Sequence, residues 1–448
     1  MAHKLFLFNF FILPFLFATC NSIEPPPPPL EKAITLTLED VSCIEAWITL
    51  STNNLQLPAT VTLKQNNITR TTINLIKPDT LLYIDSLLPN VNYNFQVSSI
   101  QHQVSSNELS VTTMDTTSHG FSWRTWEFGD ISNSYLFDVA IINENNIWAV
   151  GEILIADTSA TGYTKYNAVH WDGSEWTLHR IMFYTICGQQ SRTPYPASSV
   201  FTFSENDVWI AMYGDQVARL DGTTQIATTC LPISFSIKKI WGENPNSIYA
   251  VGDMGKIVHY QNGIGWQVIE SGTDADLLDV WGTPDGNIVW VSGREDGNKT
   301  VLIKIENNQT NIVFEDHYPW QIQEGRISGG ISSIWTNSKN FIYMTTPITV
   351  YRCLSTTSGE GQEIYPYDDY LNGGTIRIRG TTSNDIITSG SNCSILHYNG
   401  FSWKRYEQFT DINTKLWSSD IRGNIMAAVG DKLENIFYYK AIIIVGYK

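Results

Sequence analysis

Charged side chains are scarce in this chain, and the basic ones are scarcer than the acidic ones. Asp, Glu, Lys and Arg make up 16% of the 448 residues, and 28 Lys and Arg against 44 Asp and Glu leave a formal net charge of -16 at pH 7. A surface of that sign repels nucleic acid phosphates and anionic lipid headgroups. We therefore expect neither nucleic acid nor peripheral docking on an anionic bilayer.

The motifs of common enzyme and metal sites are also missing. The sequence has no Cys-x-x-Cys, no Cys/His spacing suited to zinc, no His-Glu-x-x-His, no Gly-x-Ser-x-Gly and no glycine loop for phosphate. Asp274-Ala275-Asp276 matches the Asp-x-Asp of metal-dependent glycosyltransferases, but without the α/β sheet of those enzymes it is expected to be a solvated turn. The acidic segments at residues 294–297 and 367–370 are expected to be exposed loops. We expect no cofactor, no metal and no catalytic residue.

The apolar run near the N-terminus is too short to span a bilayer. Residues 5–17 follow His3 and Lys4 and have the length of a signal-peptide core. With Ala18 and Thr19 before Cys20, the segment resembles a bacterial lipoprotein signal, although Thr19 is bulkier than the pattern prefers. The resemblance implies an exported protein with its lipid on Cys20, signal cleavage without lipid being the alternative.

A stiff tether follows the cysteine. Residues 21–30 include five consecutive prolines, which favour polyproline II and extend roughly 15 Å at about 3.1 Å per residue. Asn21 after the cysteine favours the outer membrane, by resemblance to enterobacterial sorting. The expected location is therefore the outer membrane, on its periplasmic or outer face, with secretion as the alternative.

Residues 31–115 alternate apolar and polar side chains with period two, which predicts strands that bury one face. The segment from Leu87 to Val97 resembles the Leu-x-Pro-x-x-x-Tyr entry to strand F of fibronectin type III domains. In that family the tyrosine, here Tyr93, ties back to the preceding corner, and Trp47 would be the core tryptophan of strand B. The resemblance implies a β-sandwich that acts as a spacer or binding module.

The rest of the chain, residues 120–448, is a repeat. An asparagine precedes a strand in seven copies, with spacings of 61, 40, 41, 53, 44 and 40 residues. These anchors are Asn145, Asn206, Asn246, Asn287, Asn340, Asn384 and Asn424. A period of about 40 to 50 residues with Asp-Gly and Asn-Gly turns predicts four-stranded propeller blades, and we expect an all-β chain with a seven-bladed propeller.

Two segments compete for the outer strand that closes the ring. Residues 121–128 begin within a half-copy of the repeat, Gly-Phe-Ser-Trp at residues 120–123, whereas residues 441–447 are a run of mostly apolar residues near the end of the chain. An outer strand from the N-terminal side would hide a sheet edge. The sequence leaves the choice between them open.

The repeat units Trp-Gly-x-x-x-x-Asn-x-Ile-Trp-Ala-Val-Gly and His-Tyr-Asp-Gly-x-x-Trp resemble those of bacterial exported propellers, and the repeat style is similar to photosystem II assembly factor propellers. The chain from Cys20 onward resembles uncharacterised lipoproteins that join a fibronectin type III domain to such a propeller. The resemblance implies the fold and says little about activity.

Repeat position decides how the histidines and tryptophans are interpreted. His170, His259 and His397 hold the same register in separate units, so we expect structural roles rather than a metal site. The repeat tryptophans are expected to pack one blade on the next. Cys187 and Cys230 follow outer-strand segments of neighbouring units and are candidates for a disulfide, whereas Cys43 fits a buried strand.

Binding is expected in the long insertions, because propellers commonly use loops at the ends of the channel. These insertions are residues 152–167, 185–198 and 316–329, and the ligand-binding candidates on them are Arg192, Tyr195, Tyr318 and Trp320. The sequence favours a non-catalytic scaffold that recognises an envelope protein or an extracellular glycan. A carbohydrate-active propeller with acidic residues at one channel mouth is the alternative, and a purely structural envelope component is the third.

Overall fold

The structure is a computed structural model that describes the chain except for residues 1–32, 296–298, 322–324, 356–358, 366–373 and 436–437. The proposed signal peptide, Cys20 and the tether lie outside the described residues. The chain divides into two compact units, and the larger contains all residues from Ser110 to Lys448. The described residues form strands and short 3-10 turns such as η1 (Asp253–Gly255) and η3 (Glu407–Phe409), without an α-helix. In this described part, no helix is long and apolar enough to cross a membrane.

The first strands form two antiparallel sheets. One has the order β1-β2-β5, and the other has the order β4-β3-β6-β7 with β8 paired to β6. The strands are β1 (Ala33–Val41), β2 (Ala46–Asn53), β3 (Ala59–Gln65), β4 (Ile68–Leu75), β5 (Asp79–Ile84), β6 (Asn92–Ser99), β7 (Val104–Ser105) and β8 (Leu109–Thr112).

Strand β6 explains the alternation of apolar and polar residues in this segment, because every second residue from Tyr93 to Ser99 is buried. The Tyr93 hydroxyl accepts a hydrogen bond from the backbone N–H of Leu88 at 2.9 Å, across the corner that leads into the strand. This is the hydrogen bond expected of that tyrosine. Trp47 lies on β2.

From residue 122 onward the described chain forms seven four-stranded antiparallel sheets. Their strands are β10 (Tyr135–Asn143), β11 (Asn146–Ala156), β12 (Tyr163–Trp171) and β13 (Trp176–His179); β16 (Ala197–Ser204), β17 (Asp207–Met212), β18 (Gln216–Asp221) and β19 (Thr224–Cys230); β20 (Ile237–Asn244), β21 (Ser247–Gly252), β22 (Lys256–Gln261) and β23 (Gly265–Glu270); β24 (Asp276–Gly282), β25 (Ile288–Glu295), β26 (Lys299–Glu306) and β27 (Gln309–Asp316); β28 (Ser333–Trp335), β29 (Phe341–Thr345), β30 (Val350–Leu354) and β31 (Gln362–Tyr365); β32 (Thr375–Thr382), β33 (Asp385–Gly390), β34 (Ile395–Tyr398) and β35 (Trp403–Arg405); and β36 (Thr414–Arg422), β37 (Ile425–Asn435), β38 (Tyr438–Tyr447) and β9 (Ser122–Phe128). A small hairpin, β14 (Phe183–Tyr184) with β15 (Arg192–Thr193), lies between the first two sheets in sequence.

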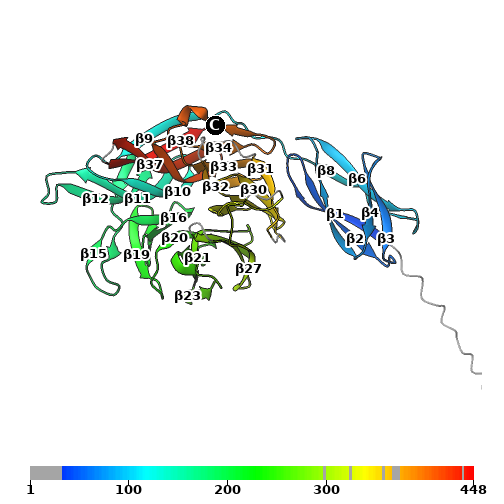
Figure 1. Cartoon of the computed structure of the whole chain (residues 1–448), viewed down its shortest axis with the longest axis horizontal. Helices are drawn as coiled ribbons and strands as arrows, with labels where there is room; N and C mark the ends of the chain where they lie inside the picture. Colours follow the sequence, from blue (N-terminus) through cyan, green and yellow to red (C-terminus); the bar gives the residue numbers. More distant parts are fainter. Residues whose placement is uncertain (1–32, 296–298, 322–324, 356–358, 366–373, 436–437) are drawn as a thin grey trace, which may run out of the picture. The chain divides into compact units, whose positions relative to one another are not determined.

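The seven sheets follow one another around a ring, from teal through green and yellow to red (Figure 1). The first strand of each sheet contacts the first strand of the next, and β36 of the last sheet contacts β10 of the first. The ring is therefore closed, and these first strands enclose an axial channel. This arrangement is a β-propeller.

Both candidates for ring closure belong to the same sheet. Residues 441–447 lie in its third strand, β38, and residues 122–128 form its fourth strand, β9, with Ile443 opposite Trp126. The two segments were not alternatives, because the last sheet uses the chain end for three strands and the N-terminal side for the fourth. Figure 1 shows β9 beside β38.

Apolar residues of neighbouring sheets form the core. One cluster joins Val139 and Trp171 of the first sheet to Val429 and Ile443 of the last, with Trp126 and Trp176 packed against it. Trp126 lies 5.5 Å from Trp171 between ring centroids. The tryptophans of the repeat thus pack sheet against sheet, as expected.

A β-bulge in the inner strand explains the glycine that five of the seven units have on the second strand, namely Gly151, Gly252, Gly293, Gly390 and Gly430. At this bulge the inner strand has one extra residue, for example between Ile237 and Lys239 opposite β21. The bulge brings a backbone carbonyl against the glycine, so a Cβ on Gly252 would lie 2.0 Å from Ser236 O. Only glycine fits at that approach.

Candidate functional site at the mouth of the channel

Each inner strand places one buried polar residue in the channel, just after the extra residue of the bulge in six sheets and at the first residue of β28 in the fifth. We call these seven residues the girdle. They are Asp138, Ser199, Lys239, Asp279, Ser333, Arg377 and Ser418. The set is electrically balanced, with two carboxylates against one Lys and one Arg, and all seven are buried.

Asp138 joins four sheets through its carboxylate. Its Oδ2 accepts hydrogen bonds from Ser199 Oγ at 2.7 Å and from Lys239 Nζ at 2.5 Å, and its Oδ1 accepts one from Ser418 Oγ at 2.8 Å. Burial would raise the pKa of Asp138, but the charges of Lys239 and Arg377 lower it. Burial lowers the pKa of Lys239 to about 8, against the attraction of Asp138.

Asp279 plays the same role on the other side of the ring. Its Oδ2 accepts hydrogen bonds from Ser333 Oγ at 2.5 Å and from Arg379 Nη1 at 2.9 Å, and its Oδ1 accepts one from Arg379 Nη2 at 2.7 Å. Although burial opposes ionisation, the charges of Arg379 and Arg377 hold the pKa of Asp279 well below its usual range. The girdle therefore ties successive sheets together by hydrogen bonds and paired charges.

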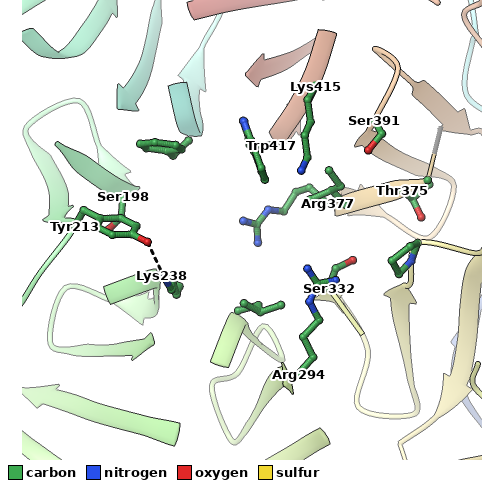
Figure 2. A pocket seen from close by; sticks show the side chains of 15 residues that line it. Ser198, Tyr213, Lys238, Arg294, Ser332, Thr375, Arg377, Ser391, Lys415 and Trp417 are labelled. Atoms are coloured by element: carbon green, nitrogen blue, oxygen red, sulfur yellow. Dashed lines mark hydrogen bonds between the residues drawn. The ribbon is translucent and has the colours of Figure 1, made fainter. Parts of the chain in front are cut away.

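A cavity of about 430 Å³ opens directly above the girdle. Its floor is formed by the residue that directly precedes each girdle residue, so every sheet contributes to it. These residues are Phe137, Ser198, Lys238, Leu278, Ser332, Ile376 and Trp417. Figure 2 shows the guanidinium of Arg377 reaching into this space, with Trp417, Lys415 and Lys238 around it. We call this space the mouth cavity.

Four cationic side chains line the mouth cavity, namely Lys238, Arg294, Arg377 and Lys415. Lys238 Nζ lies 2.9 Å from Asp253 Oδ1 and donates a hydrogen bond to the Tyr213 hydroxyl at 3.0 Å. Lys415 Nζ lies 3.6 Å from the centroid of the Trp417 ring, and burial lowers its pKa. No carboxylate occurs among the described residues that line the cavity.

A second cavity of about 500 Å³ adjoins the first and shares Ser391, Lys415 and Trp417 with it. We call it the side groove. It extends over the last two sheets to β10 of the first, and it is lined further by Tyr135, Asn392, Ile412, Asn413, Thr414, Asp431, Leu433 and Tyr439. Asp431 accepts a hydrogen bond from Trp417 Nε1, and burial raises its pKa. Because they share three lining residues, the mouth cavity and the side groove form a continuous surface.

A smaller cavity of about 220 Å³ lies below the girdle, where Trp281 and Arg379 face Asp420. Burial raises the pKa of Asp420, whose Oδ2 accepts a hydrogen bond from the Ile141 backbone. Trp281 packs against Trp241, with ring centroids 6.2 Å apart.

The candidates from the insertions do not line these cavities. Arg192 stacks on Tyr184 in the small hairpin, with its guanidinium 4.5 Å from the ring centroid, and Tyr195 packs against the core between the first two sheets. Tyr318 and Trp320 follow β27 and are 71% and 48% exposed. The four residues therefore belong to loops of different sheets and are not brought together in one of these cavities.

Cys187 and Cys230 are joined in a disulfide, with their Cα atoms 6.2 Å apart. The bond links the hairpin segment to the end of β19. Cys43, Cys353 and Cys393 are free and buried.

The repeat histidines have structural partners. His170 Nε2 lies 3.0 Å from Asn146 Oδ1, and His259 Nε2 lies 2.9 Å from Ser247 Oγ. His397 Nε2 pairs with Asp385 at 2.8 Å. Each histidine thus contacts the beginning of the second strand in its own sheet. Among the described residues, no group of three His, Cys, Asp or Glu could hold a metal ion.

The acidic segment from Asp274 to Asp276 leads into β24, whose first residue is Asp276. Asp274 is exposed and pairs with Lys299 at 2.6 Å, and Asp276 accepts a hydrogen bond from the Met254 backbone at 2.9 Å. Asp296 and Asp368 lie outside the described residues. In the part of the chain that the structure describes, acidic residues do not converge at the mouth cavity.

No protein-family model matches this sequence, and no curated protein sequence does. Among solved structures, the chain is similar to one described as YCF48 bound to D1 peptide, with 14% identity, 74% of this chain and 99% of that chain covered, and a TM-score of 0.51. It is also similar to the WD40 β-propeller domain of Doa1, with 11% identity, 74% and 98% covered, and a TM-score of 0.47. At this identity the likeness to the YCF48 structure concerns the fold alone, which is a β-propeller.

Proposed function

We propose that this protein is an exported binding module whose propeller recognises a segment of another protein at the mouth cavity. The observation that carries the proposal is the continuous surface formed by the mouth cavity and the side groove, which share Ser391, Lys415 and Trp417. A rigid concave surface with aromatic walls and a few polar groups is typical of ligand sites. The similar propeller YCF48 is described as bound to a peptide, which supports the same class of ligand here.

A random peptide library displayed on phage and selected on the immobilised protein tests the proposal. We expect the selection to enrich peptides whose affinity falls when Trp417 is replaced by Ala, because the Trp417 side chain lines both cavities. Trp320→Ala is the matched control, since this exposed tryptophan lies on another loop. If no peptide is enriched and the protein binds strongly on a glycan array, the proposal is wrong and carbohydrate recognition takes its place.

The remaining architecture is part of the same proposal. Each of the seven sheets is a blade, which makes the propeller seven-bladed. Residues 31–115 form a fibronectin type III domain, supported by the strand orders β1-β2-β5 and β4-β3-β6 and by the Tyr93 corner. Its function is that of a spacer.

The location is proposed from the sequence. Lipid on Cys20 would anchor the protein to the outer membrane and leave the propeller to meet an envelope protein. Detergent phase partition of wild type and Cys20→Ser tests this, with the mass of the N-terminal peptide as a second readout. If wild type and Cys20→Ser both partition into the aqueous phase to the same extent, the protein has no lipid anchor on Cys20.

A further inference from the structure

The mouth cavity differs in charge from the rest of the protein. The whole chain carries a formal net charge of -16, yet the described lining residues include four cations and no carboxylate. Cations gathered in a concave site with low-dielectric walls attract anions and raise their local concentration. The charge of the cavity therefore favours an anionic ligand.

Arg377 is the cation best placed to hold such a ligand. It is 8% exposed, and its guanidinium reaches into the cavity (Figure 2). Nη1 lies 2.9 Å from Asp279 Oδ1, but that carboxylate is also held by both terminal nitrogens of Arg379. Two guanidinium groups thus share one carboxylate, so the positive charge of Arg377 is only partly compensated. This charge favours a further anionic partner on the side of the cavity.

We infer that the mouth cavity binds a carboxylate of the recognised peptide, with the guanidinium of Arg377 as its main donor and Lys238 and Lys415 beside it. A guanidinium forms strong charge-assisted hydrogen bonds with carboxylate oxygens. This inference rests on the proposed function and adds the chemistry of the ligand.

The surroundings of Arg377 fit a peptide rather than a small anion alone. Phe137, Tyr213 and Trp417 provide apolar walls for the residue that carries the carboxylate. The side groove then leads outward past Asp431, whose carboxylate can accept hydrogen bonds from the peptide. The carboxylate itself can come from an Asp or Glu side chain or from a peptide C-terminus.

The experiment uses the full-length protein in detergent and two synthetic libraries of eight-residue peptides, one with free and one with amidated C-termini. Affinities of the selected peptides are measured for wild type, Arg377→Gln, Lys415→Gln and the control Arg124→Gln. Arg124 is exposed on β9, the outermost strand of its sheet. Because Arg379 still pairs with Asp279 in Arg377→Gln, we expect this variant to fold, and thermal unfolding checks it.

We expect the affinity to fall at least about tenfold in Arg377→Gln and severalfold in Lys415→Gln, with no change in Arg124→Gln. Enrichment of Asp or Glu in both libraries identifies a side-chain carboxylate, whereas binding only by the free library identifies the C-terminus. Peptides that bind without any carboxylate, or equally well to Arg377→Gln, would overturn the inference and leave the proposed function intact. A preference for phosphopeptides over their carboxylate counterparts would also overturn it. Failure of every peptide would refute both.

If Arg377→Gln does not fold, the affinities of the same peptides are measured for Lys415→Gln and Lys238→Gln instead. Binding that stays unchanged in both variants and at 0.5 M salt would overturn the inference, because screening weakens attraction between an anion and partly exposed cations.

Discussion

Arg379 and Asp279 form a two-point ion pair inside the propeller, with Nη2 2.7 Å from Oδ1 and Nη1 2.9 Å from Oδ2. They come from the inner strands of the sixth and fourth sheets, so the pair spans the intervening sheet, where Ser333 donates to the same carboxylate. Arg379 also stacks on Trp281, at 4.5 Å from its ring centroid. Both side chains are almost fully buried.

Replacing Arg379 by Leu should destabilise the propeller strongly. The substitution removes both hydrogen bonds from Arg379 and leaves buried Asp279 with Arg377 as its remaining ion-pair partner among the described residues. Breaking one side of a buried pair costs about 3 to 5 kcal/mol. Guanidinium unfolding of wild type and variant measures the loss. Arg180→Leu is the matched control because Arg180 is exposed, and it should stay within about 0.5 kcal/mol. A loss below about 1 kcal/mol for Arg379→Leu would show that the pair contributes little.

Acidification should weaken the fold through His170. Burial lowers the pKa of His170 to about 4 from the usual 6.5, so the folded protein disfavours the charged form. A depressed histidine pKa means that the unfolded chain takes up the proton first, and stability is lost as the pH falls from about 6.5 towards 4. We expect a loss of about 1 to 2 kcal/mol from this residue, less than full burial would give because solvent screens it.

Urea unfolding of wild type and His170→Gln between pH 7.5 and 4.5 checks this expectation. The difference between the two isolates His170 from other groups, such as His119, whose pKa burial also lowers to about 4. The variant should show the shallower dependence on pH. Parallel curves would contradict the assignment.

Much of the fold was predictable because a repeat carries its information many times over. The asparagine anchors and Asp-Gly or Asn-Gly turns mark one unit each, and a misread copy is corrected by the others. Ring closure was not predictable in the same way, since residues 122–128 and 441–447 each occur once and both have strand character. The pairing of Ile443 with Trp126 became visible only in three dimensions.

The mouth cavity was not predicted, and the reason is physical. Sequence reasoning looked to the long loops, including Tyr318 and Trp320, whereas the cavity is built from bulge residues of inner strands. A signal was present, because each inner strand carries a polar residue at the same step, as in Lys239-Ile240 and Asp279-Val280. Alternation alone would place these side chains in the core, and only the closed ring shows that they face a channel.

Gly252, the last residue of β21, should tolerate no side chain. In Gly252→Ala the new Cβ would lie 2.0 Å from the Ser236 carbonyl oxygen, so the bulge itself would have to move. We expect a loss of at least about 2 kcal/mol in denaturant unfolding. Gly120→Ala is the control, because its nearest atom is the Ser118 Oγ at 3.2 Å. Equal stability of the two variants would show that the bulge is adaptable.

Reduction of the disulfide should lower stability without abolishing the fold. Cys187 and Cys230 are 43 residues apart, and closing a loop of that length contributes about 2 to 4 kcal/mol. The midpoint of guanidinium unfolding should fall when a reductant is added. The double variant Cys187→Ser, Cys230→Ser should show the low midpoint with or without reductant. A wild-type midpoint unaffected by complete reduction would disprove the contribution.

Trp126 pairs with Ile443, which is distant in sequence, and this pairing closes the ring. We therefore expect Trp126 to stabilise the whole propeller. Its ring lies 5.5 Å from Trp171 and 5.9 Å from Trp176, so β9 packs the last sheet against the first. Removing it weakens the closing contact of the ring, and Trp126→Ala should lose about 2 to 4 kcal/mol, since the side chain is partly buried. Trp320→Ala removes an exposed ring of equal size and should lose less than about 0.5 kcal/mol. If both variants unfold at the same denaturant concentration as wild type, β9 does not hold the ring closed.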